Sequence, residues 1–166
     1  MIKVINVKSV DALKQISEYK NNKYVMHDVR FENVHMKRIN ALINYDLFSK
    51  NDLFINSVGL WELMQSKGGK GGHNYHDLSP KEVLDALNNI VSPYCIFKTK
   101  QDRLSIILSC VCHEGKPLMA IVEINADLID KKNAKINKLV SLYPKDDIDE
   151  IVNKLHPNEV LYINKL

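Results

Sequence analysis

Arginine and long apolar runs are both scarce in this chain of 166 residues. Arg30, Arg38 and Arg103 stand among 23 basic residues, and the net charge of +3 permits an anionic partner without requiring one. No apolar run approaches the roughly 20 residues that cross a bilayer, and the N-terminal MIKVINVKSV lacks the uninterrupted core of a secretion signal. We therefore expect a cytoplasmic protein with no membrane partner.

Cysteine is the next rare residue. Cys95, Cys110 and Cys112 are an odd number of thiols, each within an apolar run, which favours buried thiols over a disulfide framework. Cys110 and Cys112 would share one face of a strand while His113 points to the other, and no second Cys or His pair completes four ligands. The sequence therefore predicts neither a metal site nor a cofactor.

The overall composition is typical of a folded globular protein, with 45% hydrophobic and 26% charged residues. We expect residues 1–166 to form a single domain. Apolar residues at helical spacing predict helices near residues 9–21 and over 34–43, with Ser9 as the N-cap of the first. A short strand is predicted at 24–26. Residues 1–66 are therefore interpreted as a mainly helical part.

Residues 67–166 follow a different pattern. Ser79 to Glu82 has the form of a capping box with proline at the first helical position, so a helix should begin at Pro80 and end before Pro93. Strands are predicted at 94–98, 104–112, 117–124, 136–143 and 160–163, with a short helix at 146–155. The predicted fold class is α+β, with N-terminal helices followed by a four- to five-stranded antiparallel sheet.

A glycine-rich loop precedes the capped helix. Four of the six glycines lie between Lys67 and His76. The two histidines of this loop, His73 and His76, come just before a helix N-terminus, where anions bind readily, and imidazoles can move protons near neutral pH. Lys70 is followed by glycine rather than by serine or threonine, which excludes a Walker phosphate loop.

Residues on the predicted strands extend this candidate site. Ser141 and Tyr143 share one face of a strand and offer two hydroxyl groups to a bound phosphate. Lys98 directly follows two apolar residues and is predicted to face the concave side of the sheet, beside the histidines. Lys100 and Arg103 crowd the turn that follows Lys98.

The order of these motifs resembles a known family. The chain carries His76-Asp77-Leu78-Ser79, a helix, Ser92-Pro93-Tyr94-Cys95-Ile96-Phe97-Lys98, Gly115-Lys116-Pro117, Val140-Ser141-Leu142-Tyr143 and Leu161-Tyr162-Ile163-Asn164-Lys165. This order is similar to that of the phage MuF C-terminal domain, over about residues 71–166. That family is grouped with phage nucleases of the barnase, EndoU, colicin and RelE type, which implies a barnase- or RelE-like fold.

The resemblance implies an RNA-cleaving toxin of phage or mobile-element origin. We expect a metal-independent endoribonuclease that cleaves RNA, with tRNA as one candidate, through attack of the 2′-hydroxyl on the adjacent phosphate. Its catalytic residues would be His76, His73, Lys98 and Ser141. Its RNA-binding residues would be Tyr143, Lys70, Lys100 and Arg103. An antitoxin or immunity protein would be a further partner.

An alternative from another class stays open at this point. A phage-encoded inhibitor or other binding protein could keep a nuclease-like sheet without catalysis. Members of the family often carry a lysine directly before the histidine, whereas Tyr75 stands there in this chain, which favours the binding protein slightly. Transfer of ADP-ribose ranks last because the chain shows no recognisable Arg or Glu-x-Glu signature.

Overall fold

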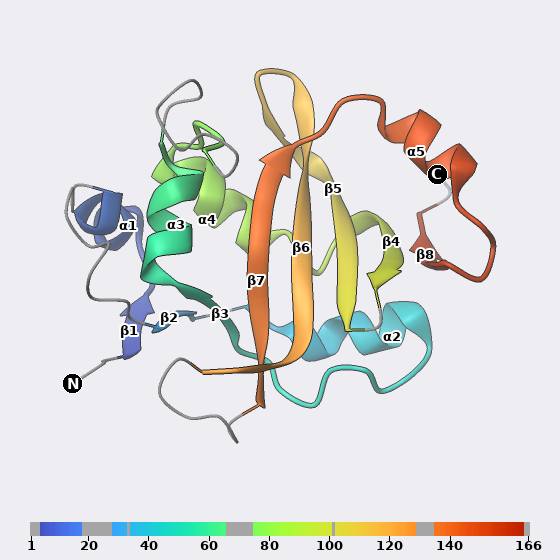
Figure 1. The fold of residues 1–166 in the computed structure, drawn as a ribbon, viewed down its shortest axis with the longest axis horizontal. Coiled ribbons are helices and arrows are strands. Elements are labelled where there is room, and N and C mark those ends of the chain that lie inside the picture. Colours follow the sequence, from blue (N-terminus) through green and yellow to red (C-terminus); the bar gives the residue numbers. More distant parts are fainter. Residues whose placement is uncertain are drawn as a thin grey trace.

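The computed structural model describes residues 4–17, 28–32, 34–65, 75–100, 102–128 and 135–164. Within these residues eight strands form one mixed sheet in the order β1-β2-β3-β7-β6-β5-β4-β8 (Figure 1). The strands are β1 Val4–Val7, β2 Asp28–Phe31, β3 Leu53–Asn56, β4 Pro93–Lys100, β5 Arg103–His113, β6 Lys116–Asp127, β7 Lys135–Pro144 and β8 Val160–Ile163. The helices are α1 Val10–Ser17, the 3₁₀ helix η2 Met36–Arg38, α2 Ile39–Ile43, α3 Ser57–Leu63, α4 Pro80–Asn88 and α5 Ile148–Lys154.

The main core joins one face of the sheet to the helices α1 to α4. Successive side chains of a strand point to opposite faces. Ile106, Ala120 and Leu142 are neighbours across β5, β6 and β7, and all three are fully buried. They belong to the same apolar cluster as Leu60 of α3 and Leu87 of α4. Burying each large aliphatic side chain contributes about 1.5–3 kcal/mol, so this face holds the helices on the sheet.

Helix α5 covers part of the opposite face. Its Ile148 and Ile151 pack against a smaller apolar cluster that contains Ile107 and Met119 of the sheet. Tyr143 of β7 also packs against this cluster and is half-buried. Figure 1 shows α5 on the β8 side of the sheet, away from α3 and α4. The face of β7 that points away from the main core therefore lies at the edge of the area that α5 covers.

The predicted fold, with N-terminal helices followed by an antiparallel sheet, is wrong. The structure is α+β, but the described part of residues 1–66 contributes three strands in addition to helices, and the sheet is mixed rather than antiparallel. β1 pairs with β2 in parallel, and β3 pairs with β7 in parallel. Each of the three missed strands has only four residues. Such short apolar segments carry too little periodicity to be told from turns or helix ends.

Several local predictions agree with the structure. Helix α4 begins at Pro80 with the predicted capping box, in which Ser79 Oγ accepts a hydrogen bond from the N–H of Glu82 at 3.1 Å. Strand β8 has the predicted bounds, and Ser9 Oγ accepts a hydrogen bond at 3.3 Å from the first turn of α1. The helix predicted over 34–43 is divided between η2 and α2. The strand predicted at 24–26 lies outside the described residues.

A β-bulge resets the alternation of side chains in β7. Val140 is an extra residue there, because consecutive residues of β6 pair with Leu139 and Ser141. Leu139 and Leu142 are both buried in the main core, whereas Val140 and Ser141 are half-buried. The bulge therefore places Ser141 and Tyr143 on the face opposite the main core.

Candidate functional site

The segment that carries His76 is fixed on both sides. The ring of Tyr75 packs edge-on against Trp61 of α3, with ring centroids 5.9 Å apart at 86°. The backbone N–H groups of Asp77 and Leu78 donate at 2.8 and 3.1 Å to carbonyl groups at and just beyond the end of α3. Leu78 is buried in the main core. These contacts hold His76 over the edge of β7.

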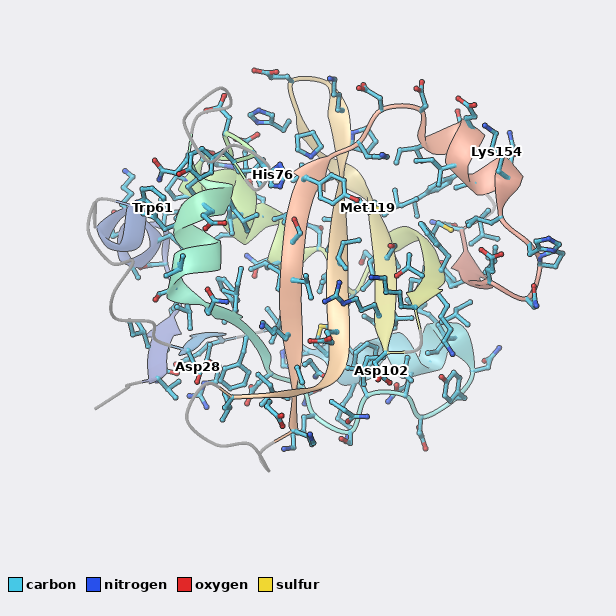
Figure 2. All side chains as sticks on the ribbon, viewed as in Figure 1. Asp28, Trp61, His76, Asp102, Met119 and Lys154 are labelled. Carbon is cyan, nitrogen blue, oxygen red and sulfur yellow. The ribbon has the colours of Figure 1, made fainter. Side chains whose placement is uncertain are left out.

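His76 meets the predicted hydroxyl residues of β7. Its Nε2 lies 3.5 Å from Ser141 Oγ, at the limit of a hydrogen bond. Its ring lies beside that of Tyr143, with centroids 5.4 Å apart and planes inclined by 32°. Figure 2 shows His76 next to one end of β7, between this strand and the helices α3 and α4. The structure thus brings together three of the predicted site residues.

The phenol of Tyr143 is suited to donate a hydrogen bond. Burial raises its pKa above the ordinary 10.0, since an apolar environment disfavours the phenolate. The phenol therefore keeps its proton at neutral pH. The imidazole of His76, the hydroxyl of Ser141 and the neutral phenol of Tyr143 are called the row below. Together they provide a proton acceptor and two O–H donors.

Two grooves lie beside this row. One, of about 370 Å³, runs between α3 and the edge of β7 and includes Ser141 and Lys138. The other, of about 390 Å³, runs between the end of β7 and α5 and includes Tyr143. The charged residues of this second groove are Lys145, Asp146, Asp147, Glu150 and Lys154. Ser141 therefore lines one groove and Tyr143 the other, while His76 is not among the described lining residues of either groove.

Lys98 lies elsewhere. β5 and β6 separate its strand from β7, which at about 4.8 Å per strand amounts to about 14 Å. Lys98 pairs with Leu104 of the main core, whereas Ser141 lies in the same cross-strand row as Phe97. Adjacent residues of a strand point to opposite faces. The structure therefore does not bring Lys98 to the histidine, contrary to the position expected from the sequence.

The remaining predicted residues are also apart from His76 or are not described. Lys100 and Arg103 pair across the β4–β5 turn, and Arg103 Nε lies 3.6 Å from a carboxylate oxygen of Glu123. Figure 2 shows Asp102, in that turn, at the end of the sheet opposite His76. Lys70 and His73 lie outside the described residues.

A second polar pair was not predicted from the sequence. His113, at the end of β5, is buried, and its Nδ1 lies 2.6 Å from Glu82 Oε2 of α4. Burial acts to raise the pKa of Glu82, but hydrogen bonds from Ser79 and His113 outweigh it, so the pKa lies below its ordinary value. The pair is separated by 31 residues in the chain. The capping box located Glu82, but no local pattern connects it with His113.

A further cleft of about 680 Å³ lies between α5 and the β5–β6 end of the sheet. Its described lining includes Tyr94, Lys116 and Asp149 and none of the predicted site residues. Its volume alone therefore does not make it the better candidate.

A comparison with known families shows which family the chain belongs to. Residues 67–166 match the family model described as the phage MuF C-terminal domain, which is about three-fifths of the 166 residues. The chain belongs to this family. The MuF match contains His76, Ser141 and Tyr143, whereas β1, β2, β3 and α1 to α3 precede it. Searches of curated proteins and of solved structures gave no match.

Among the described residues, no helix has the length and apolar character to cross a membrane.

Proposed function

We propose that this MuF domain protein is an endoribonuclease toxin of phage origin that cleaves RNA, with tRNA as one substrate, in the cytoplasm. The observation that carries the proposal is the contact of His76 with Ser141 and Tyr143 at the edge of β7. An antitoxin or immunity protein would be its natural partner. The fold alone does not give this function, because one fold hosts many activities.

The proposed reaction needs a base, an acid and donors, and no metal ion takes part in it. His76 removes the proton of the ribose 2′-hydroxyl, whose oxygen attacks the adjacent phosphorus. The bond from phosphorus to the 5′-oxygen breaks, and Tyr143 gives this oxygen a proton. The products are a 2′,3′-cyclic phosphate and a free 5′-hydroxyl. Ser141 donates a hydrogen bond to the negative charge that gathers on the phosphoryl oxygens.

The two grooves support an extended substrate. A strand that follows them would pass from the α3 side over His76 to the α5 side, with the scissile phosphate at the row of three residues. Lys138 in one groove and Lys145 in the other could contact the backbone phosphates, whereas the ammonium of Lys154 is already paired with Glu150 at 2.6 Å. Such contacts position the strand without reading its bases. Lys98, Lys100 and Arg103 are left out of this set because of their distance from His76.

The decisive experiment compares purified wild type and His76→Ala on total tRNA and on a defined RNA. Wild type should leave 2′,3′-cyclic phosphate and 5′-hydroxyl ends, and His76→Ala should be slower by about 100- to 10,000-fold. His35→Ala is a matched control, because His35 is exposed and lies before η2. Equal cleavage by His76→Ala and wild type would remove the assignment.

One observation favours the non-catalytic alternative. Among the described residues that line the α5 groove, carboxylates outnumber ammonium groups: Asp146, Asp147 and Glu150 against Lys145 and Lys154. An acidic groove fits a basic protein surface better than a nucleic acid. Expression in bacteria distinguishes the two functions: a ribonuclease arrests growth unless His76 is replaced, whereas a binding protein is tolerated and gives no RNA fragments.

A further inference from the structure

A second polar cluster lies directly after His76 in the chain. Asp77, His113 and Glu114 each offer one nitrogen or oxygen atom, and these atoms all lie within 4.8 Å of one another. Asp77 and Glu114 are exposed, whereas His113 is only 8% exposed. None of the three residues takes part in the proposed cleavage reaction, so the cluster needs its own explanation.

The two ring nitrogens of His113 have different surroundings. Nδ1 is engaged by Glu82 Oε2 at 2.6 Å. Nε2 is buried and has no hydrogen-bond partner among the described residues, although Glu114 Oε1 approaches it to 3.8 Å. A buried polar atom without a partner is uncommon, because it loses its hydration and receives nothing in return. A cation between Nε2 and the two carboxylates would satisfy it.

We propose that Asp77, His113 and Glu114 bind a divalent d-block cation, for which Zn²⁺ fits best. One imidazole nitrogen and two carboxylate oxygens are ligands that Zn²⁺ takes, with a water molecule in the fourth position. Mg²⁺ and Ca²⁺ prefer oxygen ligands throughout, so the histidine selects against them. The charges of the two carboxylates balance that of the ion.

Glu82 completes the arrangement from the other side of the ring. A metal-binding histidine usually donates its second N–H to a carboxylate, which fixes the tautomer and the orientation of the ring. The Glu82 contact at Nδ1 would leave the lone pair of Nε2 for the ion. The capping box holds Glu82 in place, since its Oε1 accepts a hydrogen bond from the N–H of Ser79 at 2.9 Å.

Binding requires only small movements of exposed groups. Ligand atoms around a tetrahedral Zn²⁺ lie about 3.4 Å apart when the bonds are about 2.1 Å, which is closer than the 4.8 Å limit found here. The side chain of Glu114 is 70% exposed, and Asp77 is exposed too, so both can rotate towards the fixed imidazole. The ion would tie the residue after His76 to the β5–β6 turn.

The test uses the full chain without an affinity tag, freed of metal with a chelator. Titration calorimetry with Zn²⁺ should show one ion per chain, and Co²⁺ should give the visible absorption of a low-coordinate site. Asp77→Asn and Glu114→Gln should each weaken Zn²⁺ binding by at least about 10-fold, and Glu82→Gln by about 10- to 100-fold. Asp102→Asn, an exposed aspartate at the other end of the sheet, should bind as wild type does.

A second measurement needs no variant. Nitrogen-15 NMR of the imidazoles should show that Zn²⁺ moves the Nε2 signal of His113 while Nδ1 stays protonated. Tighter binding of Mg²⁺ than of Zn²⁺, binding that is unchanged in both Asp77→Asn and Glu114→Gln, or an Nε2 signal insensitive to Zn²⁺ would each overturn the proposal. These readouts do not involve RNA, so they are independent of the proposed ribonuclease.

Discussion

His113 Nδ1 and Glu82 Oε2 lie 2.6 Å apart and thereby join the end of β5 to the first turn of α4. The same carboxylate accepts a hydrogen bond from the N–H of Ser79 and so closes the capping box. One side chain therefore serves helix initiation and the packing of that helix on the sheet. The segment that carries His76 leads directly into this helix start.

Loss of the Glu82 carboxylate should destabilise the fold. Glu82→Ala removes the reciprocal cap and leaves Nδ1 of the buried His113 without its partner. The free energy of unfolding should fall by about 1–3 kcal/mol, measured by urea denaturation in the presence of a chelator. Asp85→Ala is the control on the same helix: its ion pair with Lys81 is exposed and should contribute little. Equal midpoints for both variants would contradict the dual role of Glu82.

The hydroxyl groups beside His76 should matter to different degrees for RNA cleavage. Tyr143→Phe removes the proposed acid and should slow cleavage by about 100-fold. Ser141→Ala removes one neutral hydrogen bond and should slow it by about 10-fold. Tyr45→Phe provides the control, because Tyr45 is exposed. Single-turnover rates at saturating RNA would test this order, and wild-type rates for Tyr143→Phe would exclude the phenol as the acid.

Alkaline pH should weaken the fold through Cys95. Burial raises the pKa of this thiol from 9.0 to about 11. The unfolded chain releases the thiol proton near pH 9 while the folded chain retains it, so stability falls as the pH rises from 9 towards 11. Urea midpoints measured across this range should decline more steeply for wild type than for Cys95→Ala. Parallel declines would show that Cys95 is not responsible.

The part that matches the MuF family should not fold well by itself. A fragment of residues 67–166 lacks β3, which pairs with β7, and α1 and α3, which cover the main core. Its exposed apolar face and free strand edge should lead to aggregation or to binding of a hydrophobic dye. A cooperative unfolding transition of the fragment, equal in midpoint to that of the full chain, would refute this expectation.

Local signals explain what the sequence predicted well. Ser79, Pro80 and Glu82 define a helix start by short-range hydrogen bonds, and the long strands β5, β6 and β7 carry enough apolar residues to be recognised. The contact of His76 with β7 was expected from the order of motifs. The parallel pairing of β3 with β7 was not, because four-residue strands acquire their partners through the tertiary structure.

The misplacement of Lys98 has a related cause. Strand alternation gives the face of a residue only when the face of its neighbours is known, and the sequence did not show that Ile96 lies in the main core while Phe97 lies on the other side. The partnership of His113 with Glu82 was equally hidden, since it depends on where α4 lies on the sheet. Site geometry that depends on register could not be obtained from spacing.

The extra residue in β7 has a consequence for how this domain can vary. Ser141 and Tyr143 take their positions from the β6 residues opposite them, Ile121 and Met119, all of which lie on the His76 side of the bulge. A strand that alternated regularly from Leu139 onward would instead turn both hydroxyl groups towards the main core. The proposed site therefore depends on the backbone register of β7 as well as on the identity of its side chains.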